Sequence, residues 1–487
     1  MQLDASTPIP LVLYGVPFHN VTFEEALDWI VARVRSGRPA HIVTANLDFV
    51  TQAWNDPELQ RLLLDADLVL ADGFPMVKLS PLFGPPLKGR VTGSDLTPLL
   101  VARAAQEGLS VYGLGSAAGV AQKALDLLKE RHPDLKIAGT FSPPFADLLE
   151  MDHRAVLHRL EDATPDLLFV AFGAPKQDKF IRMHVRGWKV PIAMGVGASL
   201  DFIAGEQTRA PKWVQKGCGE WIWRLGGHPR RLFSRYFSNL RFLCSASFQM
   251  VRIHHLRDRL ATFQPLEQAD VQALEKKGVT VAGFHPLENE AMASEFVHRM
   301  VDRTPGQNLL LDVHTVPGLN SLELGALLEV NKGCHQWGKR LILYAPRPKV
   351  LRLLQTCRLS EYFDVATQLD EVMRIVKNRS EHLEGSTAFD QGRLTLELPI
   401  ELTAETRPSF EQDVSEVHRA LQRKGVLKTI EVDASQLDFI DSAGLGFLIS
   451  LKKTSETQGI SMSIVHLDAK PRRTFEIARV DKILLHA

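Results

Sequence analysis

Two short apolar stretches near the start of the chain each end in polar residues of types that can do chemistry. Thr44 and Asn46 lie at the end of the first stretch, His41–Ala45, and Asp72 follows the second, Leu68–Ala71. In a parallel α/β sheet, ligands bind at the carboxyl ends of the strands. A carboxylate at such an end is a candidate for acid–base chemistry, and the glycine after Asp72 permits close approach of a ligand. An Asp here could equally cap the next turn, and this stretch alone leaves both interpretations open.

The strands that must position these residues alternate with helices through the first half of the chain. Thr22 and Glu25 predict a capping box at the start of one helix, and Gly37 ends that helix. The alternation predicts an α/β fold with a Rossmann-like, doubly wound parallel sheet. Further strands are expected at Leu109–Leu114, Leu135–Gly139, Leu167–Phe172 and Pro191–Val196, with a helix at Gly119–Arg131.

Two patterns resemble nucleotide or metal sites but are interpreted otherwise. Gly113, Gly115 and Gly119 miss the dinucleotide fingerprint by one residue, which argues against a hydride-transfer enzyme. These glycines could form an anion-binding loop or only a tight turn before a helix. Asp65 and Asp67 precede their strand, away from the expected ligand crevice, so we expect solvated charges at a helix end and no metal site.

Other strand ends carry donors and cations. The run Phe172–Asp178 leaves a buried strand, and Lys176 and Gln177 in this run can direct donors into the crevice. Arg90 is a further cation at a predicted strand-to-helix boundary. Donors and cations around one carboxylate suit an anionic, hydroxyl-rich substrate.

The segment 209–259 is basic and aromatic. It holds eleven Lys or Arg residues and eight aromatic residues, but only two acidic ones. A basic amphipathic helix with aromatic residues is typical of an interfacial membrane element, and each basic residue near an anionic leaflet contributes about 1 kcal/mol. Nucleic-acid binding is the alternative for such a patch, but no nucleic-acid module accompanies it. An ordinary surface helix packed on its domain also remains open.

Composition points to a protein of the cytoplasm or the inner face of the membrane. Lys+Arg and Asp+Glu number 57 each, and the four cysteines have no metal-like spacing. The amino terminus has no signal-peptide pattern, and no apolar run reaches the ~18 residues of a membrane span.

The second half of the chain contains an internal repeat. Ser321 and Gly325 recur 121 residues later as Ser442 and Gly446. Each copy has a strand, a helix, a buried strand that ends in Asp and a helix opened by Ser, which predicts two copies of one domain of about 100 residues. Charged linkers are expected before and after the first copy, at Asp258–Lys277 and Arg379–Gly392.

Seven motifs between Pro10 and Leu243 resemble the WecG/TagA/CpsF glycosyltransferase family. They are TANLDFV, LADGFPMV, RVTGSDL, AFGAPKQDKF, GVGASLDFIAG, RAPKW and EWIWRL followed by PRRLFSRY. The resemblance implies transfer of an N-acetylhexosamine-type sugar, such as N-acetylmannosamine, from a UDP donor. It implies an acceptor sugar on undecaprenyl pyrophosphate, inversion at the anomeric carbon, and no metal or other cofactor.

The resemblance also implies roles for particular residues. Asp72 matches the family's proposed general base, and the other matched positions bind substrate. Without a metal, cations must stabilise the charge that develops on the leaving diphosphate. The matched positions are Thr44 and Asn46 in the pocket, Arg90 and Gln177 near donor or acceptor, and Arg224 and Arg231 of the basic segment, which would hold the pyrophosphate or close the site at the membrane.

The second copy of the repeat resembles STAS domains, the fold of anti-sigma factor antagonists. Its DSAGLG sequence at Asp441–Gly446 matches the family's phosphoacceptor loop, with Ser442 at the phosphorylated position. Phosphorylation of Ser442 and a plain helix N-cap both remain open. The first copy has Asn320 and Glu323 where the second has Asp and Gly, so we expect a divergent, structural or dimerising STAS domain.

Together these features predict a UDP-sugar-dependent hexosyltransferase on the inner face of the membrane, with a tandem STAS regulatory tail. The alternative is an inactive transferase that acts as a scaffold or signalling protein through STAS partner-switching. Expected partners are a UDP-sugar, a lipid-linked acceptor, the inner membrane surface, a kinase or phosphatase and a second copy of the chain, but no nucleic acid. The expected domains are 1–245, with an appendage at 209–259, then 270–378 and 391–487.

Overall fold

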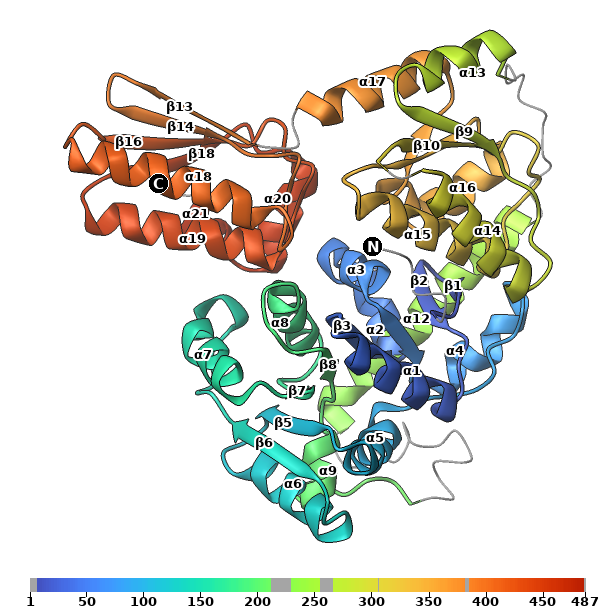
Figure 1. Ribbon diagram of the computed structural model, residues 1–487, viewed down its shortest axis with the longest axis vertical. Coiled ribbons are helices and arrows are strands. Elements are labelled where there is room, and N and C mark those ends of the chain that lie inside the picture. Colours follow the sequence, from blue (N-terminus) through green and yellow to red (C-terminus); the bar gives the residue numbers. More distant parts are fainter. Residues whose placement is uncertain (1–6, 212–228, 255–265, 305, 382–384, 486–487) are drawn as a thin grey trace.

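The structure is a computed structural model that describes all residues except 1–6, 212–228, 255–265, 305, 382–384 and 486–487 (Figure 1). It contains an amino-terminal domain, a middle domain and a carboxyl-terminal domain. In Figure 1 the middle domain (yellow) and the carboxyl-terminal domain (red) lie side by side on the amino-terminal domain (blue to green).

The amino-terminal domain is built on a six-stranded parallel sheet of order β4-β3-β8-β7-β5-β6. All six strands were predicted from the apolar runs, and the Rossmann-like fold class is confirmed. The alternation of side chains explains why both faces are covered: Val43 and Val69 enter one core, and Ile42 and Leu70 enter the other. The strands are β3 Ala40–Ala45, β4 Leu68–Ala71, β5 Ser110–Gly115, β6 Lys136–Phe141, β7 Leu167–Ala171 and β8 Ile192–Gly195.

Helices connect these strands and cover both faces of the sheet. The predicted capping box of Thr22 and Glu25 opens α1, and Gly37 ends it in the left-handed conformation. An antiparallel hairpin of β1 Pro10–Leu13 and β2 Val16–His19, which the sequence patterns did not predict, precedes α1. The helices are α1 Phe23–Ser36, α2 Leu47–Ala53, α3 Pro57–Asp65, α4 Phe74–Leu79, α5 Gly93–Glu107, α6 Val120–Arg131, α7 His153–Ala163, α8 Lys176–His184, α9 Ser199–Ala204 and α12 Pro229–His254, with 3-10 turns η1 Ser80–Leu82 and η2 Leu148–Glu150.

The middle domain has a four-stranded parallel sheet of order β12-β11-β10-β9. Its strands are β9 Val279–Gly283, β10 Asn308–Asp312, β11 Leu341–Tyr344 and β12 Asp364–Ala366. Its helices are α13 Gln268–Glu275, α14 Glu290–Arg303, α15 Ser321–His335, α16 Pro348–Thr356 and α17 Leu369–Glu381, with η3 Leu359–Glu361.

The carboxyl-terminal domain has a four-stranded sheet of order β13-β14-β16-β18, and a two-stranded pair of β15 and β17. Its strands are β13 Ser386–Asp390, β14 Arg393–Glu397, β15 Glu401–Leu402, β16 Thr429–Asp433, β17 Phe439–Ile440 and β18 Ser461–Val465. Its helices are α18 Arg407–Arg423, α19 Ser442–Thr457, α20 Ala469–Ile477 and α21 Asp481–Leu484.

The two copies of the repeat are visible in this order of elements, since β10 and α15 correspond to β16 and α19. The predicted linkers contain more regular structure than expected. Helix α13 lies within the first linker, and the end of α17 and all of β13 lie within the second. Strand β13 is an exposed edge strand, so its polar composition concealed it.

Candidate active site

The end of β4 places Asp72 beside the end of β3. The Asp72 amide donates a hydrogen bond of 3.0 Å to the Ala45 carbonyl, and the Val91 amide donates one of 2.9 Å to the Ala71 carbonyl. Asp72 and Arg90 therefore flank the same strand end, although 18 positions separate them in the chain. Neither side chain is fully buried, so both are accessible to a ligand.

Asn46 and Thr44 form the neighbouring part of this site. The Asn46 Oδ1 caps α2 by accepting hydrogen bonds from the Asp48 and Phe49 amides at 3.0 and 3.2 Å. A Cβ on Gly73 would lie 3.7 Å from the Asn46 Cβ, which shows that the ends of β3 and β4 are in contact range. A Cβ on Gly93 would lie only 2.9 Å from the Thr44 Oγ1, so the TGSD motif needs its glycine.

Arg90 is held by an aromatic ring. Its guanidinium carbon lies 4.5 Å from the centre of the Phe74 ring, in the LADGFP motif. A cation–π contact of this kind orients the guanidinium, and a guanidinium can bind an anion through its N–H groups. The structure thus brings together four of the predicted site residues: Thr44, Asn46, Asp72 and Arg90.

Gln177 lies farther along the edge of the sheet, after β7. Its side chain is buried, and its Oε1 accepts a hydrogen bond of 3.0 Å from the Gly197 amide. A Cβ on Gly195 would lie 2.5 Å from the Gln177 Nε2, so that glycine allows the amide to enter. Gln177 holds the loop after β8, and its contact with substrate stays a prediction.

The interpretation of Lys176 as a donor directed into the crevice was wrong. Its ammonium group donates to the Ala146 carbonyl and lies 5.4 Å from the centres of the Phe145 and Phe172 rings. Partial burial lowers the pKa of Lys176. A backbone acceptor and two aromatic faces can hold the ammonium group without a substrate anion.

An ion pair that the sequence reasoning missed lies at the same edge. Arg209 binds Asp95 through two hydrogen bonds, of 2.5 and 3.0 Å. The hydrogen bond from Arg209 is the main cause that lowers the pKa of Asp95. The pair joins the TGSD and RAPKW motifs. The sequence indicated it only in that Asp95 and Arg209 are charged residues of two motifs to which no role had been assigned.

The basic helix α12 reaches the site through Arg235, which forms an ion pair with Asp48 in the first turn of α2. Asp48 is two residues from Asn46, so this contact brings α12 to the predicted pocket. Arg224 lies outside the described residues, and so does the side chain of Arg231. Their predicted roles remain predictions.

Helix α12 has two different apolar faces. One face is buried, and its Phe242 packs edge-to-face on Tyr14 and Trp54, with ring centres 5.6 and 5.3 Å apart. The other face is exposed, and its apolar residues recur at intervals of four, three, eight and three positions, which keeps them on one side of the helix. Its members are Phe233, Phe237, Leu240, Phe248 and Val251, each between 55% and 64% exposed. Among the described residues, no helix is long and apolar enough to cross a membrane.

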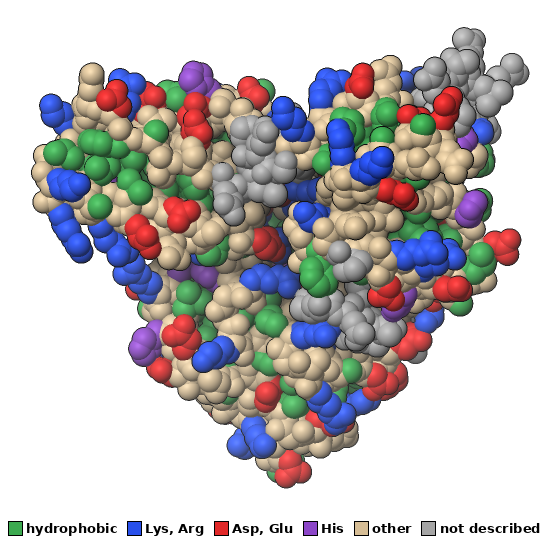
Figure 2. Space-filling model, turned by 45° about the horizontal axis from the view of Figure 1, so that its top comes forward, with side chains coloured by type: hydrophobic (Ala, Val, Ile, Leu, Met, Phe, Trp, Pro, Cys, Tyr) green, Lys and Arg blue, Asp and Glu red, His purple; other side chains and the backbone are tan. Residues whose placement is uncertain are grey.

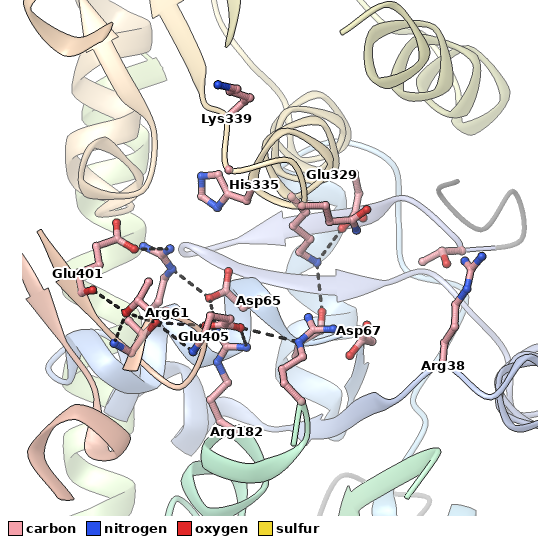
Figure 3. Close-up of a pocket in the computed structure, with 18 of the residues that line it drawn as sticks. Arg38, Arg61, Asp65, Asp67, Arg182, Glu329, His335, Lys339, Glu401 and Glu405 are labelled. Carbon is pink, nitrogen blue, oxygen red and sulfur yellow. Dashed lines mark hydrogen bonds and ion pairs between the residues drawn. The ribbon is translucent and has the colours of Figure 1, made fainter. Parts of the chain in front are cut away.

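A cavity of about 430 Å³ lies at the amino-terminal ends of the strands, opposite the site around Asp72, where the three domains meet (Figure 3). Several ion pairs line this cavity, and Asp65 takes part in two of them, with Arg61 at 3.0 Å and with Arg182 at 2.9 Å. The Tyr362 hydroxyl of the middle domain donates to the same carboxylate at 2.9 Å. Figure 2 shows Lys and Arg side chains (blue) around the notch between the upper lobes of the molecule.

The expectation that Asp65 and Asp67 are solvated was therefore wrong. Burial alone would raise the pKa of Asp65, but Arg61 and Arg182 lower it to about 2. Asp67 forms an ion pair of 3.1 Å with Arg33. Among the residues that the structure describes, no group of three or more His, Cys, Asp or Glu side chains is placed to hold a metal ion.

Ser442 is not at a free surface. It is 2% exposed, and its amide donates a hydrogen bond of 2.6 Å to the Glu58 carboxylate on α3 of the amino-terminal domain. The N-cap of α19 is Asp441, which accepts from the amides of Ala443 and Gly444, so the N-cap interpretation of Ser442 was wrong. Phosphorylation of Ser442 would require this contact to open.

The amino-terminal domain is thus an α/β domain with a parallel doubly wound sheet that carries a carboxylate and an arginine at one strand end. Two copies of a small α/β module follow it. A family model for the glycosyl transferase WecG/TagA/CpsF family matches residues 11–255. Models for the STAS domain match residues 285–372 and 386–486. The chain belongs to the WecG/TagA/CpsF family of glycosyltransferases, and its middle and carboxyl-terminal domains are STAS domains.

The chain is similar to several enzymes named N-acetylglucosaminyldiphosphoundecaprenol N-acetyl-beta-D-mannosaminyltransferase. The one from Bacillus spizizenii is 34% identical over 192 residues, which are 39% of this chain and 73% of the relative. One from Staphylococcus aureus is 31% identical over 223 residues, which are 45% of this chain and 86% of the relative. One from Bacillus subtilis is 26% identical over 220 residues, 45% of this chain and 84% of the relative.

Proposed function

We propose that the protein transfers an N-acetylhexosamine-type sugar, similar to N-acetylmannosamine, from a UDP donor to a sugar carried on undecaprenyl pyrophosphate. Surface polysaccharide or exopolysaccharide synthesis is the process that needs this product. The names of the relatives support the sugar and the acceptor. The observation that carries the proposal is that Asp72 and Arg90 flank the end of β4, beside Asn46.

In the proposed mechanism Asp72 is the general base. The acceptor hydroxyl attacks the anomeric carbon from the face opposite UDP, and Asp72 takes the hydroxyl proton as the new bond forms. Attack from that face inverts the anomeric configuration. Negative charge develops on the leaving diphosphate, and Arg90, with Arg224 and Arg231 of the basic segment, would stabilise it without a metal.

The exposed face of α12 supports a peripheral site of action on the inner membrane surface. Five large apolar side chains on that face are more than half exposed, and Arg241 and Arg252 lie exposed on the same helix. Such a face binds at the boundary of head groups and acyl chains. There it would present the transferase site to a lipid-linked acceptor.

Turnover by the full chain tests this function. The purified protein would be supplied with UDP-N-acetylmannosamine or UDP-N-acetylglucosamine and a synthetic polyprenyl-pyrophosphate-linked N-acetylglucosamine in vesicles. We expect UDP release and a product heavier by one sugar residue. Asp72→Asn should keep donor binding and lose about 10²-fold or more of turnover. Wild-type turnover in that variant would refute the base assignment, and no turnover with any UDP-sugar would favour the scaffold function.

We also propose that the STAS tail regulates the transferase, through a kinase or phosphatase that acts on Ser442 or through self-association of the chain. The division of the chain into 1–245, 270–378 and 391–487 is part of this proposal. The contact between Ser442 and α3 supports it, because α3 leads directly into β4 and Asp72.

A further inference from the structure

Both STAS domains contact the transferase domain through the same part of their fold. In the first, the Ser321 amide donates a hydrogen bond of 2.8 Å to the Phe83 carbonyl. In the second, the equivalent Ser442 amide donates one of 2.6 Å to the Glu58 carboxylate. The start of the helix that follows the buried strand is thus the docking face in both copies.

The glycine one turn later shows how closely each helix approaches. A Cβ on Gly325 would lie 1.7 Å from the Pro10 carbonyl oxygen, so α15 packs directly on the backbone of β1. The nearest atoms to a Cβ on the equivalent Gly446 would be side-chain carbons of Leu149 and Met183, at 3.8 and 3.9 Å. The helix of the second domain therefore approaches the transferase domain less closely at this position.

The two interfaces also differ in chemistry. Buried apolar residues of the first STAS domain form one continuous core with β1, β2, α2 and α3 of the transferase domain. The second STAS domain has a core of its own, to which the transferase domain adds only the partly buried Leu149. Ion pairs hold the second domain instead: Arg182 binds Glu405 at 2.6 Å, and Arg61 binds Glu401 at 3.4 Å.

Negative charge is already concentrated where Ser442 meets the transferase domain. Glu58 and Asp441 are 5% and 4% exposed, and Lys179 binds Glu58 at 2.6 Å. Burial and the Glu58 charge raise the pKa of Asp441 to about 6, although its hydrogen bonds and Arg182 favour the charged form. A third negative group would have to be accommodated in the same closed space.

We infer that the second STAS domain closes reversibly on α3 and α8 of the transferase domain, and that a negative charge on Ser442 opens this contact by repelling Glu58. The partner of the Ser442 surface is thus the transferase domain of the same chain. Few apolar residues of the two domains pack together at this interface, and ion pairs supply most of its contacts. Contacts of this kind typically form and break. This inference concerns contact between domains and does not rest on the proposed sugar or acceptor.

Hydrogen exchange of the full chain tests the inference. In Ser442→Asp we expect amides of 57–65 and 176–184 to exchange about tenfold faster or more than in the unaltered protein, because like charges in contact oppose closure. Ser461→Asp, which adds the same charge at an exposed position of the same domain, should leave these amides unchanged. The double variant Glu58→Gln with Ser442→Asp should recover most of the protection.

Two outcomes would overturn the inference. One is unchanged or slower exchange at α3 and α8 in Ser442→Asp, which would mean that Lys179 and Arg182 capture the new charge and tighten the contact. The other is failure of Glu58→Gln to restore protection. If Ser442→Asp unfolds its own domain, seen as lost protection of β16, then Glu405→Lys provides the test. Glu405 is 40% exposed, and its carboxylate forms ion pairs with Arg182 of α8 and with Arg186 just after that helix. Inside its own domain it accepts a hydrogen bond of 3.3 Å from the Thr403 hydroxyl.

Discussion

Gly325→Ala and Gly446→Ala are equivalent substitutions whose effects should have opposite signs. Each glycine is the fifth residue of its helix, α15 or α19. In an open helix interior, alanine is favoured over glycine by about 0.5–1 kcal/mol. Gly446→Ala meets nothing closer than 3.8 Å, so it should be neutral or stabilising by that amount.

Gly325→Ala cannot gain this stabilisation. Its Cβ would lie 1.7 Å from the Pro10 carbonyl oxygen and 2.8 Å from the Pro10 carbonyl carbon. A normal carbon–oxygen contact is more than 3 Å, so α15 would have to move away from β1 by over an ångström. Overpacking of this kind costs about 1–3 kcal/mol, and here it falls on backbone, which yields less than a side chain.

The two variants would be compared by thermal unfolding and by hydrogen exchange of the full chain. We expect Gly325→Ala to lower the first unfolding transition and to speed exchange in β1 and α15, while Gly446→Ala leaves both unchanged or raises stability. Unfolding of three domains need not be two-state, so local exchange rates carry the comparison. Equal stability of the two variants would refute the close approach of α15 to β1.

Three further predictions concern other parts of the molecule. Closure of the second STAS domain should weaken from pH 5 to pH 7, because the raised pKa of Asp441 means that closure takes up a proton; hydrogen exchange at α3 measures this. The charged groups that face Asp441 are Glu58, Arg61, Asp65, Arg182 and Lys179, and Glu58→Gln should flatten the pH dependence. Asp95→Asn should weaken the pair with Arg209 and speed exchange in 205–211 without loss of helix content by circular dichroism. Unchanged exchange would contradict the role of the pair. Phe237→Ser should reduce binding to vesicles with anionic lipid about tenfold and leave stability unchanged, whereas Phe242→Ser should lower stability by about 2–4 kcal/mol; vesicle binding that survives Phe237→Ser would refute the membrane face.

Features that leave a local or a recurring pattern of residues were predictable from the sequence. The strands around Thr44 and Asp72, the capping box of Thr22 and the repeat that relates Ser321 to Ser442 each leave a local pattern of apolar, capping or recurring residues. The prediction that Asp72 and Arg90 share one edge of a sheet needed only the rule that ligands gather at the carboxyl ends of strands. Their roles in chemistry stay predictions.

Features that depend on contacts between distant segments were not predictable in this way. Asp65 looks like any acid at a helix end, and only the fold brings Arg182 and Tyr362 to it. Ser442 matches an exposed loop in pattern, yet Glu58, 384 positions away, covers it. The sequence does not reveal whether water hydrates a charged side chain or an opposite charge of another domain pairs with it, because the same residue types occur in both environments.

The shared core of the transferase domain and the first STAS domain has a practical consequence for truncation. A fragment that stops after α12 would expose the apolar faces of β1, α2 and α3 that Leu322, Leu324 and their neighbours now cover. Exposed faces of that size lead to aggregation. Expression of the catalytic part should therefore succeed when the chain is cut after α17 and fail when it is cut at the end of the glycosyltransferase match. The boundary of the enzyme as a folding unit thus lies beyond its boundary as a sequence family.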